Sequence, residues 1–107
     1  MMDEKTVIKK AIFRYLDPDQ SFVFLFGSRA TDHFRPSSDY DIGLYSGNKI
    51  PLKTIAKIKD CLEDYPIPVN IDFVDFSVVS EEFKSVATRD VQIWNRPKKD
   101  SKLTLPF

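Results

Sequence analysis

The sequence predicts a single α/β (α+β) domain, in which helices pack on a small mixed β-sheet. The chain has 107 residues, which suffices for one domain. Hydrophobic residues make up 42% of it, an ordinary proportion for a globular protein. Short apolar runs of strand length alternate with segments of helical periodicity, a pattern typical of helices packed on a sheet.

The first two elements are a helix and a buried strand. Residues 3–16 have the periodicity of an amphipathic helix, and Asp3 is suited to cap it because its carboxylate can accept hydrogen bonds from free amides. Pro18 disfavours the helical conformation in Asp17, so we expect the helix to end before this point. The uncharged aromatic and β-branched run at 22–26 predicts a strand that is buried on both faces.

A sharp turn and a polar loop separate this strand from the next. Gly27 and Ser28 end the first strand, and one helical turn is expected at 28–32. The polar residues 31–38 indicate a loop. A second strand is predicted at 39–45, where turn residues close it.

The second half repeats the alternation of helices and strands. Pro51 suits the first turn of a helix that runs to about residue 65, and the segment 69–75 predicts a third strand. Ser80, followed by two glutamates, is expected to cap a short helix. Alternating polar and apolar residues predict a last strand at 91–94.

We expect one domain over residues 1–95, followed by a mobile C-terminal segment at 96–107. That segment mixes proline, lysine and serine, a composition that favours no regular structure. The sequence has no apolar run of about 20 residues and no signal-peptide region. We therefore expect a cytoplasmic protein with no membrane partner.

The composition also excludes several kinds of site. Sixteen Lys+Arg balance sixteen Asp+Glu, so direct nucleic-acid binding, which usually relies on a basic excess, is not expected. Cys61 and His33 are the only cysteine and histidine. Two such residues are too few for a disulfide framework or for a Cys/His zinc site.

Three aspartates point to phosphoryl chemistry. Asp39 and Asp41 alternate with Tyr40 at the start of a predicted strand, so both carboxylates project to the same side. Asp72 lies in the middle of the third predicted strand and could face Asp41 across paired strands. Carboxylates that gather in this way are typical ligands of hard divalent cations, and they suggest in-line transfer at two metal ions.

The turn after the first strand suits a phosphate. Gly27 has no side chain, so a ligand can approach its backbone closely, and the Ser28 hydroxyl stands where free amides favour an anion. This turn and the three carboxylates together predict a site for phosphoryl transfer.

These residues resemble a known family. The stretch 24–30, followed by 38–41, is similar to the GS-x10-DxD signature of the polymerase-β-like nucleotidyltransferase superfamily. The segment 69–75 resembles the third-carboxylate strand of its smallest members, the minimal nucleotidyltransferases (MNT), which commonly pair with a HEPN-domain toxin. The resemblance implies the polymerase-β-like fold.

The resemblance also implies an activity. This activity is the transfer of AMP from ATP to a tyrosine hydroxyl of a HEPN toxin, and it depends on Mg²⁺, with two ions expected. The modification silences the toxin, so the chain would act as its antitoxin. The residues implied to contact the nucleotide are Gly27, Ser28 and Arg29, the last of which could instead fix the loop. The residues implied to be catalytic and to bind metal are Asp39, Asp41 and Asp72, with Asp75 as a second candidate for the third carboxylate.

Other functions stay open at this point. The chain could neutralise its partner by occlusion, with the carboxylates dispensable. It could also transfer a nucleotide to a small molecule or to tRNA, although no segment of the sequence suggests an acceptor-binding domain. We expect acceptor specificity to come from a partner protein, in a hetero-oligomer.

Overall fold

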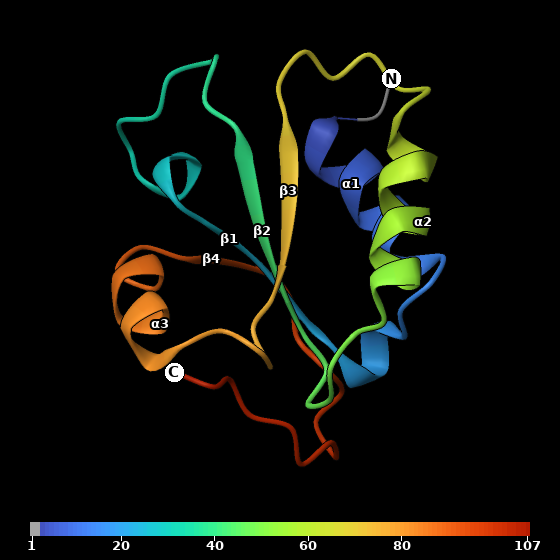
Figure 1. Ribbon diagram of the computed structural model, residues 1–107, viewed down its shortest axis with the longest axis vertical. Helices are drawn as coiled ribbons and strands as arrows, with labels where there is room; N and C mark the ends of the chain where they lie inside the picture. Colours follow the sequence, from blue (N-terminus) through green and yellow to red (C-terminus); the bar gives the residue numbers. More distant parts are fainter. Residues whose placement is uncertain (1–2) are drawn as a thin grey trace.

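The computed structural model describes residues 3–107, which form a four-stranded mixed sheet with helices on both faces (Figure 1). The strands have the order β3-β2-β1-β4. They are β1 (Phe22–Phe26), β2 (Tyr40–Tyr45), β3 (Ile71–Asp75) and β4 (Gln92–Asn95). The helices are α1 (Glu4–Phe13), α2 (Leu52–Leu62) and α3 (Glu81–Ala87), with short 3₁₀ turns η1 (Pro18–Gln20) and η2 (Ser28–Ala30).

The predicted fold class and order of elements are confirmed, and the differences concern the ends of elements. The first two helices end three residues earlier than expected, at Phe13 and Leu62. After each, the chain leaves the α-helical pattern through a tighter bond, from Tyr15 N–H to Ile12 O and from Tyr65 N–H to Leu62 O, both 3.1 Å. The turn expected at 28–32 is a single 3₁₀ turn.

The sheet has one face under two helices and one face under aromatic side chains. Helices α1 and α2 lie on the first face, as Figure 1 shows, where residues such as Ile8, Ile42 and Ile58 are fully buried. On the other face, Phe24 and Phe76 pack edge to face, with ring centroids 4.7 Å apart. Strand β1 lies between the two clusters and all of its residues are buried, which confirms the prediction for 22–26.

The two predicted helix caps are present. The Asp3 carboxylate accepts a hydrogen bond from Thr6 N–H at 2.7 Å, and this bond lowers the pKa of Asp3. Ser80 accepts from Phe83 N–H at 3.1 Å. Both side chains satisfy amides that a helix leaves free at its start.

The C-terminal segment 96–107 has no helix or strand, and it runs back against the aromatic face. The Phe107 ring lies 5.3 Å from the Phe24 ring, centroid to centroid. Whether the domain boundary lies at residue 95 stays a prediction.

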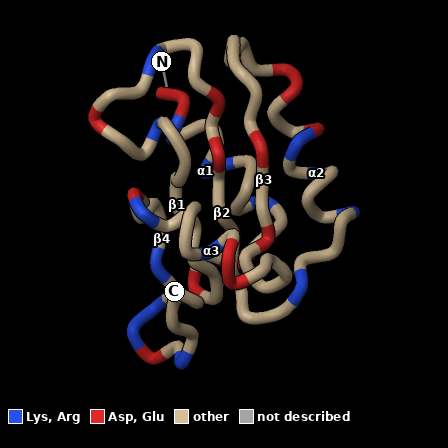
Figure 2. Tube along the Cα trace, turned by 60° about the vertical axis from the view of Figure 1, so that its left-hand side comes forward, with Lys and Arg blue, Asp and Glu red and all other residues tan. Residues whose placement is uncertain are grey.

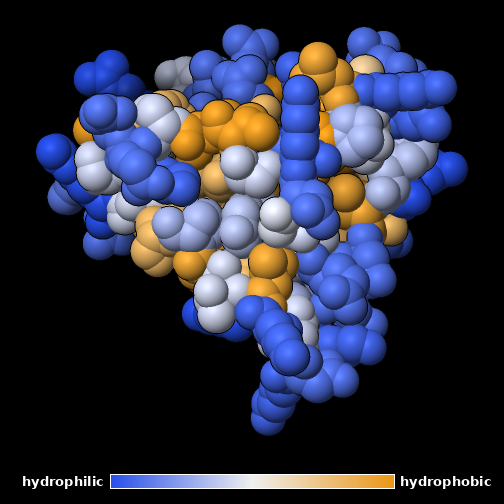
Figure 3. All heavy atoms as spheres, turned by 60° about the horizontal axis from the view of Figure 1, so that its bottom comes forward, coloured by the Kyte–Doolittle hydropathy of each residue, from blue (hydrophilic) through white to orange (hydrophobic). Residues whose placement is uncertain are grey.

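One face of the molecule is mostly hydrophilic (Figure 3). The face in Figure 3 shows separate hydrophobic patches among charged and polar residues, and exposed hydrophobic side chains in the structure include Val78, Val86 and Phe107. Within residues 3–107, every helix is too short or too polar to cross a membrane.

Candidate active site

The candidate site is a row of residues across three neighbouring strands. Strand β1 pairs antiparallel with β2 so that Phe26 lies opposite Asp41. Strand β2 pairs in parallel with β3 so that Asp41 lies opposite Asp72. The Gly27–Ser28 turn, which follows Phe26, therefore stands beside Asp41, and Asp72 stands on the other side of it. The predicted pairing of Asp41 with Asp72 is present.

Gly27 is needed at the turn for two reasons. Its φ of +73° lies in a region that favours glycine. A Cβ atom added there would lie 2.3 Å from Asp41 Oδ2, well inside a van der Waals contact. The backbone of the turn and the Asp41 carboxylate are therefore in direct proximity, which only a residue without a side chain permits.

The three carboxylates lie close enough to affect one another. Burial raises the pKa of Asp41 above its ordinary value, and the charges of Asp72 and Asp39 raise it further. Figure 2 shows the acidic positions of β2 and β3 side by side near the same end of the sheet. The row therefore carries concentrated negative charge.

In the described part of the chain, no Lys or Arg forms a salt bridge with these carboxylates. Within residues 3–107, the single salt bridge joins Lys84 and Glu81, so Asp39, Asp41 and Asp72 have none. As the side chains stand in the described chain, no three His, Cys, Asp or Glu groups are gathered tightly enough to form a metal site. The oxygen-only donor set with no counter-cation nevertheless suits Mg²⁺, which keeps several of its waters and needs few protein ligands.

Asp75 serves the fold instead. It lies three positions after Asp72, so its side chain points to the opposite face of β3. The Asp75 carboxylate is buried and accepts hydrogen bonds from Ile50 N–H at 2.7 Å, Ser77 N–H at 2.9 Å and Ser77 Oγ–H at 2.7 Å. Both of its oxygens accept hydrogen bonds, and Asp72 is the carboxylate of β3 that shares a face with Asp41.

Arg29 holds the loop that leads to Asp39. Its guanidinium donates from Nε to Ser38 O at 2.7 Å and from Nη2 to Pro36 O at 2.9 Å. It also lies 4.1 Å from the centroid of the Tyr40 ring, a cation–π contact. These contacts match the second of the two roles left open for Arg29, and its contact with phosphate stays a prediction.

Tyr40 anchors the start of β2, a role that the sequence did not reveal. Its hydroxyl donates to Glu4 Oε1 of α1. Burial and this hydrogen bond raise the pKa of Tyr40 to about 12. The residue between the two aspartates is thus fixed to the helical face, so Asp41 points to the other face.

A cavity of about 380 Å³ opens beside the turn. Its lining is mainly apolar. It comes from the end of β1 and the turn after it, and from α3 and the residues that follow α3: Phe26, Gly27, Ser28, Thr31, Phe83, Val86, Ala87, Arg89 and Asp90. The residues from α3 were not predicted, because their place beside the turn depends on packing between distant segments. The cavity lies within the size range of small-molecule sites.

The sequence matches a known family. Residues 8–99 match the family described as polymerase beta, nucleotidyltransferase. The chain belongs to this family. The matched range includes every residue that the sequence assigned to the site, and the nucleotidyltransferase class predicted from the Gly-Ser and Asp-x-Asp motifs is confirmed.

One curated relative has a related sequence. The chain is 28% identical over 83 residues to the probable protein adenylyltransferase MntA of Haemophilus influenzae. The alignment covers 78% of this chain and 72% of that protein. The resemblance to the minimal nucleotidyltransferases is thereby confirmed.

Solved structures of toxin–antitoxin complexes share the fold. A mutant MntA–HpeT complex matches with a TM-score of 0.67 at 17% identity, over 88% of this chain and 75% of that one. A toxin–antitoxin structure with AMP-PNP matches with a TM-score of 0.67 at 19% identity, over the same shares. A tri-AMPylated Shewanella oneidensis HEPN toxin in complex with MNT antitoxin gives 0.57 at 15% identity, over 86% and 73%.

Proposed function

We propose that this chain transfers AMP from ATP to a tyrosine hydroxyl of a HEPN-domain toxin and so acts as its cytoplasmic antitoxin. The observation that carries the proposal is the row formed by the Gly27–Ser28 turn, Asp41 and Asp72. The relative described as a probable protein adenylyltransferase supports AMP as the transferred group and a protein as the acceptor. The structural neighbour that contains a HEPN toxin supports the partner.

Mg²⁺ fits the donor set of the site. Asp39, Asp41 and Asp72 offer hard oxygen ligands, and no salt bridge within residues 3–107 compensates their charge. Two ions bound there would neutralise the charge that develops on the phosphates. Asp39 and Asp41 would hold both ions, and Asp72 would hold one.

The chain's own residues position the reacting groups. Free amides and the Ser28 hydroxyl at the Gly27–Ser28 turn bind the triphosphate, and the neighbouring cavity gives room to the nucleotide. The acceptor oxygen forms a bond to the α-phosphorus while the bond from that phosphorus to pyrophosphate breaks. Asp72 takes the proton of the acceptor hydroxyl. Arg29 holds the loop before Asp39 and thereby the position of that carboxylate.

The intact mass of the partner tests this proposal. The product of the neighbouring gene is incubated as the proposed HEPN partner with this chain, ATP and Mg²⁺, and we expect a gain of one or more AMP units. The Asp39→Asn/Asp41→Asn double variant is expected to abolish the gain. Asp60→Asn/Asp64→Asn is the matched control, because it removes the same charge from exposed positions outside the site.

Two results would contradict the proposal. An unchanged mass, with a stable complex on a sizing column, would support an antitoxin that acts by occlusion. A mass gain that survives in the Asp39→Asn/Asp41→Asn variant would remove these two aspartates from the reaction.

A further inference from the structure

The row of residues places the reaction on a line across the sheet. Neighbouring strands lie about 4.8 Å apart, so roughly 10 Å separate the turn after β1 from Asp72 on β3, with Asp41 between them. In-line transfer puts the attacking and leaving oxygens on opposite sides of the phosphorus. If pyrophosphate leaves over the Gly27–Ser28 turn, the acceptor hydroxyl arrives from the β3 side.

The β3 side of the sheet is open. Strand β3 is an edge strand, with β2 as its neighbour in the sheet. Between β3 and the end of α2 lies a groove of about 390 Å³, which we call the β3 groove. Its lining includes Lys59, Tyr65, Val69, Ile71, Asp72 and Phe73. The groove therefore borders the strand position that carries Asp72.

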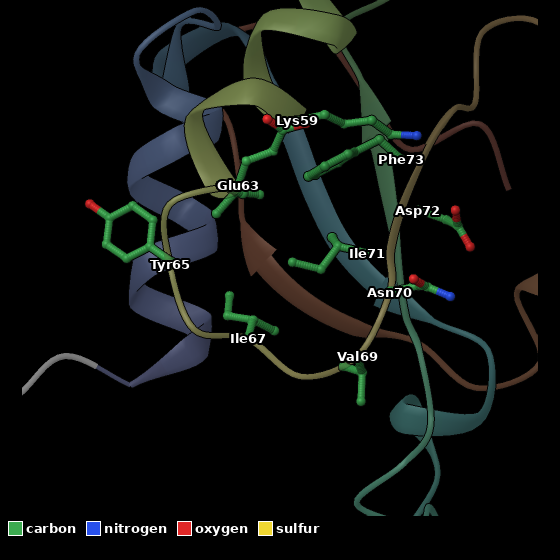
Figure 4. Close-up of a pocket in the computed structure, with 10 residues that line it drawn as sticks. Lys59, Glu63, Tyr65, Ile67, Val69, Asn70, Ile71, Asp72 and Phe73 are labelled. Carbon is green, nitrogen blue, oxygen red and sulfur yellow. The ribbon is translucent and has the colours of Figure 1, made fainter.

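The side chains of β3 divide between the two faces. Figure 4 shows Ile71 and Phe73 pointing toward α2, whereas Asn70 and Asp72 point to the opposite side. A segment that follows this edge would contact apolar side chains on one face and would bring a group beside Asp72 on the other.

The outer edge of β3 can pair with another strand. On the inner side, Asn70 O accepts from Tyr40 N–H and Phe76 N–H donates to Leu44 O, both at 2.9 Å. Because backbone groups alternate along a strand, those of Ile71 and Phe73 point to the outer edge. A free edge of this kind can accept an extended peptide, with affinity from the main chain and specificity from adjoining pockets.

We infer that the acceptor protein docks on this chain through an extended segment that pairs with the outer edge of β3 and fills the β3 groove. The segment carries the acceptor hydroxyl to Asp72, opposite the leaving pyrophosphate. The inference rests on the proposed function and adds to it where the acceptor binds. A small molecule or tRNA acceptor would not use the free amides of this edge.

Hydrogen exchange tests the docking directly. The probe is the partner protein of the mass experiment, added to this chain without ATP. We expect the amides of Ile71 and Phe73 to exchange at least tenfold more slowly in the complex. Strand β4, at the opposite edge of the sheet, is the internal control, and its outer amides should not change.

A pair of tyrosine variants tests the groove through kinetics. Tyr65 lines the groove and is 42% exposed, and Tyr15 lies outside it and is 39% exposed. We expect Tyr65→Ala to raise the KM for the HEPN-domain protein about tenfold, a typical cost for an aromatic contact at an interface. The kcat and the KM for ATP should stay unchanged. Tyr15→Ala should leave all three constants unchanged.

The outcomes separate the docking site from the proposed function. Normal transfer with no protection at β3, or with equal effects of Tyr65→Ala and Tyr15→Ala, would overturn the docking site alone. Protection at β3 with no AMP transfer would overturn the proposed function and support the docking surface. A lack of both transfer and protection would overturn both.

Discussion

Strand β3 carries two aspartates whose surroundings differ in burial, hydrogen bonding and neighbouring charge. Asp75, at its end, is 7% exposed and accepts hydrogen bonds from Ile50 and Ser77. Asp72, three positions earlier, is exposed, and its neighbour across the strands is Asp41. One carboxylate is surrounded by donors, and the other stands beside a like charge.

The difference separates a structural from a chemical role. A buried carboxylate with its hydrogen bonds made contributes to folding, because its donors would be left unsatisfied without it. A carboxylate next to another carboxylate raises the free energy of the folded chain unless a cation binds. Residues of the second kind are candidates for function, since their placement does not serve stability.

The largest expected effect is on transfer. We expect Asp72→Asn to slow AMP transfer by about 10²–10⁴-fold, because the amide can neither accept the proton of the acceptor hydroxyl nor bind metal with a charge. The free energy of unfolding should not fall, since Asp72 forms no salt bridge within residues 3–107. Single-turnover transfer to the HEPN-domain protein and urea unfolding check the two parts.

Asp60→Asn is the control for this prediction, because Asp60 is also exposed. It should leave the rate and the stability unchanged. A variant Asp72→Asn that transfers AMP within about threefold of the wild-type rate would assign Asp72 no part in the chemistry.

Substitution of Gly27, in the turn beside Asp41, should lower both the stability and the transfer rate. Gly27→Ala places a methyl group against Asp41 Oδ2 at a φ of +73°, so we expect a loss of about 1–3 kcal/mol in stability and a lower transfer rate. Gly47→Ala is a matched control, because Gly47 has a φ of +86° and lies outside the row. It should lose stability and keep its kcat. Equal kcat losses in the two variants would contradict a role for the turn.

Substitution of Asp75 should lower stability and leave the transfer rate unchanged, the reverse of what we expect for Asp72. Asp75→Ala removes the acceptor of the buried Ile50 N–H, and an unsatisfied buried donor costs about 1–3 kcal/mol. We expect a lower midpoint in urea with an unchanged m-value, and an unchanged kcat when the folded fraction is taken into account. Ser77→Ala, which removes one donor hydroxyl, should have a smaller effect. A loss of kcat in Asp75→Ala would make Asp75 part of the site.

The sequence predicted the parts of the site that depend on local pattern. The uncharged run at 22–26 predicted a buried strand. The alternation of Asp39, Tyr40 and Asp41 predicted that Tyr40 and Asp41 point to opposite faces of the sheet, and the Tyr40 hydroxyl does bind Glu4 on the helical face. Strand alternation alone could not decide between Asp72 and Asp75. The register of β3 against β2 and the donors at Ile50 distinguish them, and both depend on packing between distant segments.

The contacts of Arg29 with the loop could not be predicted from the sequence either, because they also depend on how separate segments fold together. Arg29 was placed at the phosphates or at the loop, and its hydrogen bonds to Pro36 and Ser38 appear when the loop folds back on it. The β3 groove likewise forms where the end of α2 meets the strand. The motif spacing indicates which residues are present in the site, and tertiary structure decides what each one touches.

The smallest expected effect is on the free energy of unfolding, to which the charged Asp41 carboxylate contributes unfavourably. Its pKa in the folded chain lies above the ordinary value of 3.8, so the folded state binds the proton more tightly than the unfolded state. The contribution of Asp41 to stability is therefore highest at low pH and falls as pH rises from about 3.8 through the raised pKa. Asparagine carries no charge, so Asp41→Asn should be more stable at pH 7 by roughly 0.2–1 kcal/mol, the size of a like-charge strand pair.

Thermal unfolding between pH 3 and pH 8, without metal or nucleotide, measures this gain, which should vanish below about pH 3.8. Mg²⁺ with a non-hydrolysable ATP analogue should reverse the order of the two proteins, because ligand at about 100 times its Kd stabilises the wild type by roughly 2.7 kcal/mol. A gain in Asp41→Asn that persists with both ligands would mean that no cation relieves the charge of the row. The contrast between Asp72 and Asp75 would then be a difference in packing alone.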